Sequence, residues 1–327
     1  MRKFFASAAF AAICFSSVFT GCQKEVVTES VSEERATLRI AVQHPETKVV
    51  TGMEESSIKN YQVFLFKESG IIEDYVCQAS SDITLDCTVG KKMVVVIANA
   101  PAMGDVMDIE TLNTKTTLLS DNAVDAFVME GRKEVTIYSP EAIDVSISVT
   151  RKVAKVQLTS LTVAIDMPQY SSMPFKVQSV FLINVPAEMT YFETIESPLW
   201  YNKSGYDPED FNDLTYDDME GFEITDETPY VAQNVFYCYP NKVATDSYDA
   251  TWCPRNTRLV VEATLGDETY YYPVKLPKLE QNRRYDVKLT VTRPGNLTPD
   301  SEFKKFDANF QISVVDWSHG SSISKEY

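Results

Sequence analysis

Hydrophobic and polar residues alternate along much of this chain, which is the pattern of half-buried β-strands. The first alternating segment spans residues 36–43, and Pro45, which cannot continue a central strand, should end it. Its apolar face carries Ala36, Leu38, Ile40 and Val42. Further β-branched and aromatic runs, each bounded by turn residues, predict strands at 61–66, 82–89, 93–100, 145–150, 151–165, 176–185, 235–240, 258–265, 269–276, 284–292 and 306–317.

Two segments depart from simple alternation. Residues 93–100 are apolar on both faces, which predicts a central strand that is covered on both sides. Between residues 105 and 129, Val106, Ile109 and Leu112 have helical spacing, so we expect one or two short helices over one end of the first sheet. Many strands and few helices together predict an all-β protein with minor α content, built from β-sandwiches.

The length of 327 residues exceeds the size at which one hydrophobic core stops growing. A second run of strands begins at residue 151, so we place a domain boundary there. We expect an N-terminal sandwich over 36–150 and a C-terminal sandwich over 151–327. The hydrophobic share of 44%, with 17 Phe and 17 Tyr, indicates globular packing rather than disorder.

The N-terminal residues have the pattern of a secretory signal peptide. Two basic residues precede an apolar stretch at 4–19, which at about 16 residues is shorter than the roughly 20 needed to cross a bilayer. The stretch ends in FTGC, which is similar to a bacterial lipobox, although Phe is unusual at its first position. We therefore expect a lipoprotein signal peptide over 1–21, a lipid on Cys22 and a flexible acidic tether over 22–35. An ordinary signal peptide followed by a chance cysteine is the alternative.

The composition excludes several classes of function. A formal net charge of −17 disfavours binding to nucleic acid or to anionic lipid headgroups. The sequence contains none of the nucleophile, zinc-protease, P-loop or dinucleotide-binding motifs. Its two histidines, His44 and His319, fall in a strand break and in a polar tail, so the commonest acid–base catalyst is nearly missing. We expect neither enzymatic activity nor a cofactor.

Four cysteines remain once the signal peptide and Cys22 are set aside: Cys77, Cys87, Cys238 and Cys253. An exported chain can oxidise them, and the local choices are Cys77 with Cys87 and Cys238 with Cys253. Four buried free thiols are the alternative. Zinc is not expected, because the sequence has no C-x-x-C pair.

The interval 200–230 is dense in carboxylates and aromatic residues. We interpret it as a long solvated loop that is packed by its aromatic side chains. Calcium is an alternative because it prefers carboxylate oxygens, but the D-x-D-x-D-G spacing is missing and we predict no metal.

Several segments in a fixed order resemble the fimbrillins, the subunits of type V pili on Gram-negative oral and gut bacteria. ATLRIAVQ, the basic Lys48 and SSIKNYQVFLF resemble the N-terminal region of that family. MVVVIANAPAM (93–103) resembles its core strand, and RKVAKVQL resembles the start of its second domain. EQNRRYDVKLTVTRPG (280–295) and FQISVVDW (310–317) resemble its C-terminal strands. The resemblance implies two tandem transthyretin-like Greek-key β-sandwich domains.

The resemblance also implies a mechanism. Fimbrillins are exported as lipoproteins, and a trypsin-like protease cuts after a basic residue just past the first strand. That strand leaves, and a strand from a neighbouring subunit fills the groove. Here the removable strand and its cleavage loop span 36–48, and the implied cut separates Lys48 from Val49. Arg35 precedes the strand and Arg39 lies inside it, so both fit the cut less well.

The C-terminal tail departs from the family pattern. The family's donor strand comes from the C-terminus, but residues 318–327 are mostly polar, and only Ile323 and Tyr327 are large and apolar. We predict a structural subunit of a fimbria that assembles with other copies or related subunits. An accessory or tip adhesin subunit is one alternative, and a surface lipoprotein that binds glycan or host protein is another. The precursor should sit at the outer membrane through its lipid, and the cut form in the fimbrium at the cell surface.

Overall fold

The computed structural model describes residues 34–44, 55–192, 197–203, 212–231, 233–243, 245–247, 252–301, 308–317 and 322–326. Strands dominate these residues, and the helices among them are short: α1 (Ile109–Thr114) and two 3-10 turns, Leu119–Asp121 and Asp213–Thr215. The prediction of an all-β fold with minor helix is confirmed. Within the described ranges, every helix falls short of the length and apolar character that crossing a membrane requires.

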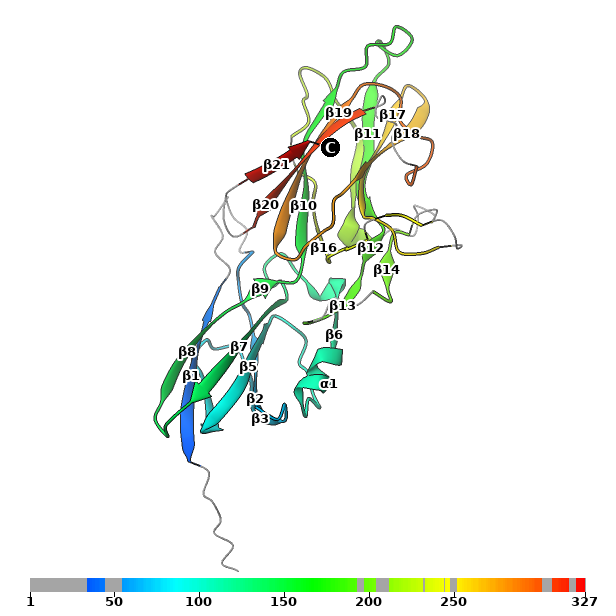
Figure 1. The fold of residues 1–327 in the computed structure, drawn as a ribbon. Helices are drawn as coiled ribbons and strands as arrows, with labels where there is room; N and C mark the ends of the chain where they lie inside the picture. Colours follow the sequence, from blue (N-terminus) through cyan, green and yellow to red (C-terminus); the bar gives the residue numbers. More distant parts are fainter. Residues whose placement is uncertain are drawn as a thin grey trace, which may run out of the picture. The chain divides into compact units, whose positions relative to one another are not determined.

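The strands of the N-terminal half form two sheets that share one hydrophobic core (Figure 1). A three-stranded sheet has the order β4-β1-β8, and a five-stranded sheet has the order β3-β2-β5-β7-β9. The bounds are β1 (Arg35–Gln43), β2 (Tyr61–Lys67), β3 (Ile72–Gln78), β4 (Ile83–Thr88), β5 (Gly90–Ala98), β7 (Met129–Ile137), β8 (Ile143–Ser148) and β9 (Thr150–Arg151).

Strand β5 is a central strand buried on both faces, as its continuous apolar run predicts. Val94 and Val96 point into the main core, whereas Val95 and Ile97 belong to a second cluster on the other face. That cluster includes Leu112 of α1, so the helix covers this face of the sheet. Helix α1 begins after Asp108, whose carboxylate accepts a hydrogen bond from the Thr111 N–H at 2.6 Å. The expected short helix is therefore present.

The strands of the C-terminal half form two further sheets, with the orders β16-β10-β19-β20-β21 and β15-β11-β17-β18. Two short pairs, β12-β14 and β13-β6, accompany them, and β6 comes from the N-terminal half. The bounds are β6 (Thr116–Leu118), β10 (Ala154–Val163), β11 (Phe175–Ile183), β12 (Val185–Pro186), β13 (Glu188–Thr190), β14 (Trp200–Tyr201), β15 (Tyr216–Glu223), β16 (Val235–Cys238), β17 (Arg258–Leu265), β18 (Glu268–Lys275), β19 (Arg283–Val291), β20 (Ala308–Asp316) and β21 (Ser322–Glu326).

The predicted domain boundary coincides with a change in strand pairing. Strands up to Arg151 pair among themselves, and strands from Ala154 onward do the same, apart from the β6–β13 pair. The main core nevertheless runs continuously from Leu38 to Trp317, and Glu34–Tyr327 forms one compact unit. The division into two domains stays a prediction.

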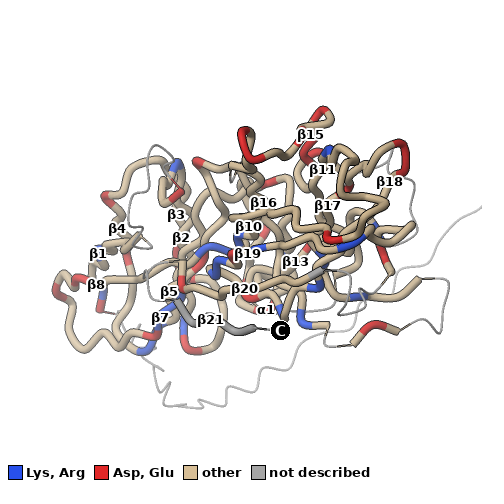
Figure 2. The backbone as a smooth tube through the Cα atoms, turned by 90° about the horizontal axis from the view of Figure 1, so that it is seen from above, with Lys and Arg blue, Asp and Glu red and all other residues tan. Residues whose placement is uncertain are grey.

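The expectation of one long loop over 200–230 is wrong for residues 216–223, which form strand β15 against β11. Asp and Glu residues are frequent along this strand, which lies at the edge of its sheet (Figure 2). Glu220 and Gly221 have positive φ angles of 51° and 72° beside a shift in the β11–β15 register. This bulge interrupts the alternation that would have marked a strand, and acidic residues on an edge protect it from pairing with other chains.

Candidate functional site

Strand β1 is the central strand of its sheet, and its backbone is paired on both sides. It runs antiparallel to β4, with Leu38 opposite Leu85, and parallel to β8, with Leu38 opposite Ile143. The β4 pairing covers Arg35–Ile40 and the β8 pairing covers Leu38–Gln43, so every residue of β1 is paired on at least one edge and residues 38–40 are paired on both. The strand that the sequence predicts at 36–43 is therefore confirmed. It lies between β4 and β8.

The apolar face of β1 points into the main core, as predicted. Ala36, Leu38 and Ile40 are 4%, 0% and 3% exposed, and Val42 is partly buried against the same core. Burying a Leu or Ile side chain fully contributes roughly 1.5–3 kcal/mol each. We call the space that β1 occupies the β1 groove. Its described walls are Ile83, Leu85 and Cys87 of β4 and Ile143, Val145 and Ile147 of β8.

Cys87 closes one end of the β1 groove. Its Sγ donates to the backbone carbonyl of Ala36 at 3.4 Å, and it lies directly opposite Ala36 in the β1–β4 register. Burial raises the pKa of the Cys87 thiol, so it is neutral near pH 7. The thiol is therefore shielded from solvent by the strand that the sequence predicts to be removable.

All four predicted disulfide candidates are free thiols in the structure. Cys77 is exposed on β3, whereas Cys87 is buried on β4, so the two side chains face different environments. Cys238 is fully buried on β16, where burial raises the pKa of its thiol to about 12. Cys253 donates its Sγ–H to the Ser247 carbonyl at 2.7 Å instead of meeting Cys238. Neither local pair is bonded in the structure, and of the four thiols only Cys87 and Cys238 are buried, so the alternative of four buried free thiols is met for two of them. Oxidation of these cysteines in the exported chain stays a prediction.

The predicted lipidation and cleavage residues lie outside the described residues: Cys22, Lys48 and Val49. The described residues on either side of the cleavage loop are joined by a hydrogen bond. The His44 imidazole, at the end of β1, donates through Nδ1 to the Ser56 carbonyl at 3.0 Å, and both groups are exposed. The contact joins the described residues on either side of segment 45–54.

A buried polar cluster around Glu55 fixes the chain where it emerges from this loop. The Glu55 carboxylate accepts hydrogen bonds from Lys155 Nζ at 2.8 Å, Tyr237 Oη at 2.7 Å and Trp317 Nε1 at 2.9 Å. These donors belong to β10, to β16 and to the end of β20. The Arg151 guanidinium lies over the Trp317 ring at 4.5 Å and donates to the Glu55 carbonyl at 2.9 Å. The start of the N-terminal sheets is thus tied to the C-terminal sheets.

The pKa values in this cluster follow from burial and hydrogen bonding. Burial alone pushes the pKa of the Glu55 carboxyl upward, but the hydrogen bonds from Lys155, Tyr237 and Trp317 and the charge of Lys155 outweigh it. The pKa of Glu55 is therefore lowered. Burial and the neighbouring carboxylate raise the pKa of the Tyr237 phenol, so it stays a donor. Nothing in the sequence around Glu55 marks this cluster, which sequence analysis missed.

The C-terminal tail forms an edge strand of its own subunit. Strand β21 pairs antiparallel with β20, with Ser322 opposite Val315 and Ile323 opposite Val314. The side chain of Ile323, and Tyr327 as a whole, lie outside the described residues. The backbone of the predicted donor tail is therefore engaged within its own sheet.

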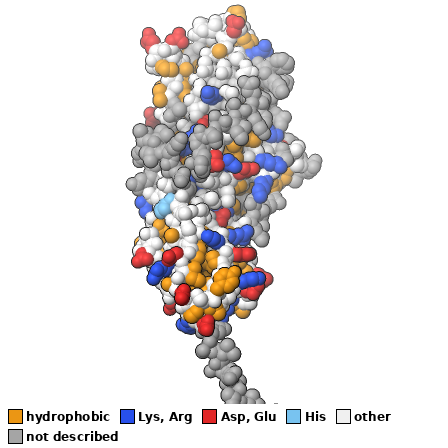
Figure 3. All heavy atoms as spheres, turned by 60° about the vertical axis from the view of Figure 1, so that its left-hand side comes forward, with side chains coloured by type: hydrophobic (Ala, Val, Ile, Leu, Met, Phe, Trp, Pro, Cys, Tyr) orange, Lys and Arg blue, Asp and Glu red, His pale blue; other side chains and the backbone are white. Residues whose placement is uncertain are grey.

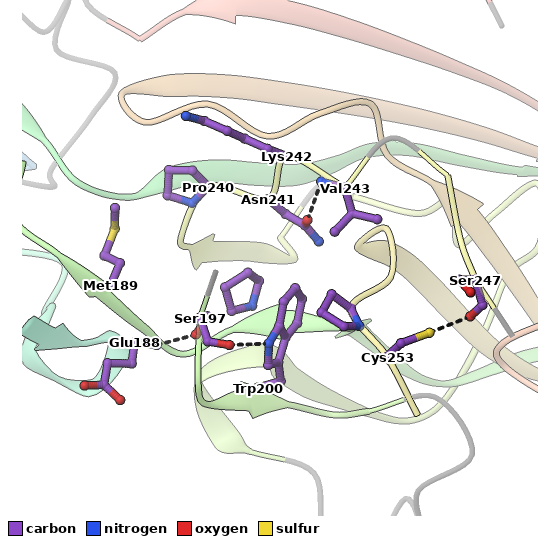
Figure 4. A pocket seen from close by; sticks show the side chains of 12 residues that line it. Glu188, Met189, Ser197, Trp200, Pro240, Asn241, Lys242, Val243, Ser247 and Cys253 are labelled. Atoms are coloured by element: carbon purple, nitrogen blue, oxygen red, sulfur yellow. Dashed lines mark hydrogen bonds between the residues drawn. The ribbon is translucent and has the colours of Figure 1, made fainter. Parts of the chain in front are cut away.

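A pocket of about 490 Å³ lies beside the β12–β14 pair (Figure 4). Three prolines, Met189 and Trp200 contribute apolar walls. Two of its polar groups have internal partners: the Trp200 indole donates to the Ser197 carbonyl at 2.8 Å, and Asn241 Oδ1 accepts from the Val243 N–H at 3.0 Å. Among the described residues no cluster of His, Cys, Asp or Glu could hold a metal ion.

The surface shown in Figure 3 has hydrophobic side chains gathered over the N-terminal half, between acidic and basic ones. Large apolar side chains are exposed in that half, for example Ile71 at 58% and Tyr138 at 87%. Single exposed apolar residues are normal on protein surfaces. They do not by themselves define a binding site.

Comparisons with known proteins agree with this architecture. Residues 36–159 match the family model described as "Major fimbrial subunit protein (FimA)". The chain is 20% identical over 365 aligned residues to the major fimbrium subunit FimA type-2 of Porphyromonas gingivalis, covering 91% of this chain and 94% of the relative. It is 19% identical to FimA type-3 of the same organism, covering 90% of this chain and 92% of the relative.

Solved structures show the same fold. A "putative cell adhesion protein" from Bacteroides eggerthii superposes with a TM-score of 0.67 at 19% identity, covering 87% of this chain and 96% of that one. A fimbrilin from Porphyromonas gingivalis superposes with a TM-score of 0.61 at 17% identity, covering 85% and 96%. At these identities the likeness establishes the fold alone.

Proposed function

We propose that this chain is a fimbrillin that is exported as a lipoprotein, cut after Lys48 and assembled by exchange of its first strand. It is a structural subunit of a fimbria at the cell surface. The lipid on Cys22 holds the precursor at the outer membrane, and a trypsin-like protease removes residues up to Lys48. The cut form then joins other copies or related subunits.

The observation that supports this proposal most strongly is the position of β1. It is the first strand among the described residues and yet a central strand, with β4 on one side and β8 on the other. Removing it leaves two rows of unpaired backbone groups and an apolar slot, which together form a template for another strand. Strand addition of this kind gains main-chain hydrogen bonds and side-chain pockets. Head-to-tail contacts between unlike surfaces propagate into a fibre instead of closing.

An accessory or tip subunit is the alternative, because the mostly polar segment 318–327 is a weak candidate for a donor strand. Binding of glycan or host protein would use the pocket beside β12 and β14. Its apolar walls and the charged side chains of Glu188 and Lys242 would supply the contacts.

The cleavage step is tested by sequencing the mature N-terminus. We expect the chain recovered from surface fibres to begin at Val49, and Lys48→Ala to leave an uncut precursor outside the fibres. Arg39→Ala is the matched control, because Arg39 is a nearby basic residue whose side chain is 63% exposed within β1. Its cleavage and incorporation should be normal. Fibre subunits that begin at Cys22 or at Ala36 would refute the assignment.

Removal of β1 is tested by the reactivity of Cys87. In the precursor a maleimide should label exposed Cys77 quickly and buried Cys87 and Cys238 slowly. After residues up to Lys48 are removed, Cys87 should become reactive, because the backbone of Ala36 no longer covers its Sγ. Cys238 lies in the core beneath β16 and should stay protected. Mass spectrometry of the labelled peptides gives the rates, and a Cys87 that stays unreactive after cleavage would show that the groove collapses.

A further inference from the structure

A buried lysine lies at the junction between the N-terminal and C-terminal strands. Lys152 follows β9 and precedes β10, and its side chain is 3% exposed. Its Nζ donates hydrogen bonds to the Tyr191 carbonyl at 2.5 Å and to Oε1 of Gln281 at 3.1 Å. The second contact places a lysine amine, which is a nucleophile when it is neutral, beside the acyl carbon of a primary amide.

One carboxylate oxygen lies near both of the nitrogen atoms concerned. Oε1 of Glu130 on β7 is 3.9 Å from Lys152 Nζ, and it accepts a hydrogen bond from Gln281 Nε2 at 3.3 Å. A carboxylate that moves a proton between two nitrogens must come within about 2.6–3.2 Å of each. Shifts of less than about 1 Å bring the Glu130 oxygen to that distance from both atoms.

Backbone hydrogen bonds hold together the segments that carry these side chains. The Lys152 N–H donates to the Val128 carbonyl at 2.9 Å, and the Asn282 N–H donates to the Val153 carbonyl at 2.9 Å. Strands β10 and β19, which follow the segments of Lys152 and Gln281, pair in parallel. Because the Cδ–Oε1 bond of Gln281 is about 1.23 Å long, its Cδ lies no more than about 4.3 Å from Lys152 Nζ. Reacting atoms must approach to about 3–3.5 Å, so a small side-chain movement is enough.

The surroundings of the amine favour its neutral form. Burial lowers the pKa of the Lys152 ammonium, the negative charge of Glu130 raises it, and the positive charge of Lys242 lowers it, with a lowering as the net result. A lysine whose pKa is lowered by burial has a larger fraction of nucleophilic amine at neutral pH. Burial therefore acts in the same direction as the geometry.

We propose that Lys152 and Gln281 join in an intramolecular amide bond, with Glu130 as the group that moves the proton. The Lys152 Nζ attacks Cδ of Gln281, so that the Nζ–Cδ bond forms and the Cδ–Nε2 bond breaks. Glu130 takes one proton from Nζ and delivers it to Nε2, which leaves as ammonia. One amide replaces another, so the reaction needs no oxidant and no further reactant.

The bond closes residues 152–281 into a covalent ring that contains the strands from β10 to β18. It ties the start of β10 to the start of β19, the strand beside it in the sheet. A ring of this length restricts the unfolded chain, as a disulfide across a long loop does. A pulling force that acts on the two ends of the chain cannot extend the segment within the ring.

The wild-type protein isolated from cells tests the bond directly. Intact-mass spectrometry should give a mass that is lower by one ammonia than that of the same chain without the bond. Digestion should give one branched peptide, in which the Lys152 side chain is joined to the Gln281 side chain. This peptide map requires no substitution, so its result does not depend on the folding of a variant.

Three substitutions test the roles of the three side chains. Lys152→Arg keeps a positive charge but cannot form the bond, and Gln281→Ala removes the acyl group, so both should abolish the loss of ammonia. Glu130→Gln keeps both reactants, and pulse-labelled protein should lose ammonia at least about 100-fold more slowly than wild type. Gln178→Ala is the matched control, because the Gln178 carboxamide donates to the Thr264 hydroxyl at 3.1 Å, and it should react as wild type does.

Folded wild-type protein in which the Lys152 and Gln281 peptides are separate and unmodified would overturn the proposal. Ammonia loss that persists in Gln281→Ala would also overturn it, since the ammonia would come from another residue. A wild-type rate in Glu130→Gln would overturn the role of Glu130. None of these results bears on assembly by strand exchange, which the mature N-terminus and the labelling of Cys87 test separately.

Discussion

Replacing Leu38 by Asp should destabilise the precursor by at least about 4 kcal/mol, because it removes a fully buried side chain and places a carboxylate in an apolar slot. Leu38 is 0% exposed, and its partners across β4 and β8 are Leu85 and Ile143. Urea denaturation of the precursor, monitored by fluorescence, measures the change in the free energy of unfolding.

The control for this substitution is Arg39→Ala at the next position of the same strand. Arg39 faces solvent and only approaches Asp144 at 3.9 Å, so its loss should change the stability by less than about 0.5 kcal/mol. If Leu38→Asp costs no more than Arg39→Ala, β1 contributes nothing to the core, and its removal would open no groove.

The second large effect is expected at Glu55, where Glu55→Ala should cost about 3–5 kcal/mol. The substitution leaves Lys155, Tyr237 and Trp317 without the acceptor that all three share in a buried site. Glu55→Gln keeps a carbonyl acceptor and loses the charge, so its cost should be smaller. Thermal and urea denaturation distinguish the two variants.

Lowering the pH should remove part of the stabilisation that Glu55 contributes to the folded protein. The pKa of its carboxyl is lowered in the folded protein, so its stabilisation is present above the unfolded value of about 4.3 and is lost as the pH falls through the lower folded value. The stability gap between wild type and Glu55→Gln should therefore narrow below about pH 4. Glu68→Ala is the control, because Glu68 pairs with Lys91 on the surface and both side chains are more than two-thirds exposed. A Glu55→Ala variant as stable as Glu68→Ala would show that the cluster does not hold the loop end.

The alternation of apolar and polar residues predicted the strands that pack one face against the core. β1, β17 and β19 were expected within one or two residues of their bounds, because their apolar positions recur at every second residue. β3, β7 and β15 were missed. β3 and β15 are edge strands, whose burial is low on both faces, and β7 carries four charged residues among its nine. Their hydrophobic signal is weak because most of their side chains remain in water.

The sequence predicted only the part of the candidate site that lies within a single continuous segment. The four inward positions of β1 could be read from their spacing, whereas the Glu55 cluster joins residues up to 262 positions apart. No local pattern records that Trp317 donates to Glu55, since the contact depends on how four separate segments pack. The predicted disulfide pairs also depended on long-range packing that the sequence does not record. Whether Cys77 and Cys87 meet depends on which face of its strand each occupies, and β3 was not recognised as a strand.

The pairing of β1 has a directional consequence. Because β1 is antiparallel to β4 and parallel to β8, its two edges present different hydrogen-bond patterns to its neighbours. A replacement strand that keeps both of these pairings has to run in the same direction as β1. Under the proposed exchange, every donor strand that keeps them enters the β1 groove in one direction, which would give the filament a single polarity.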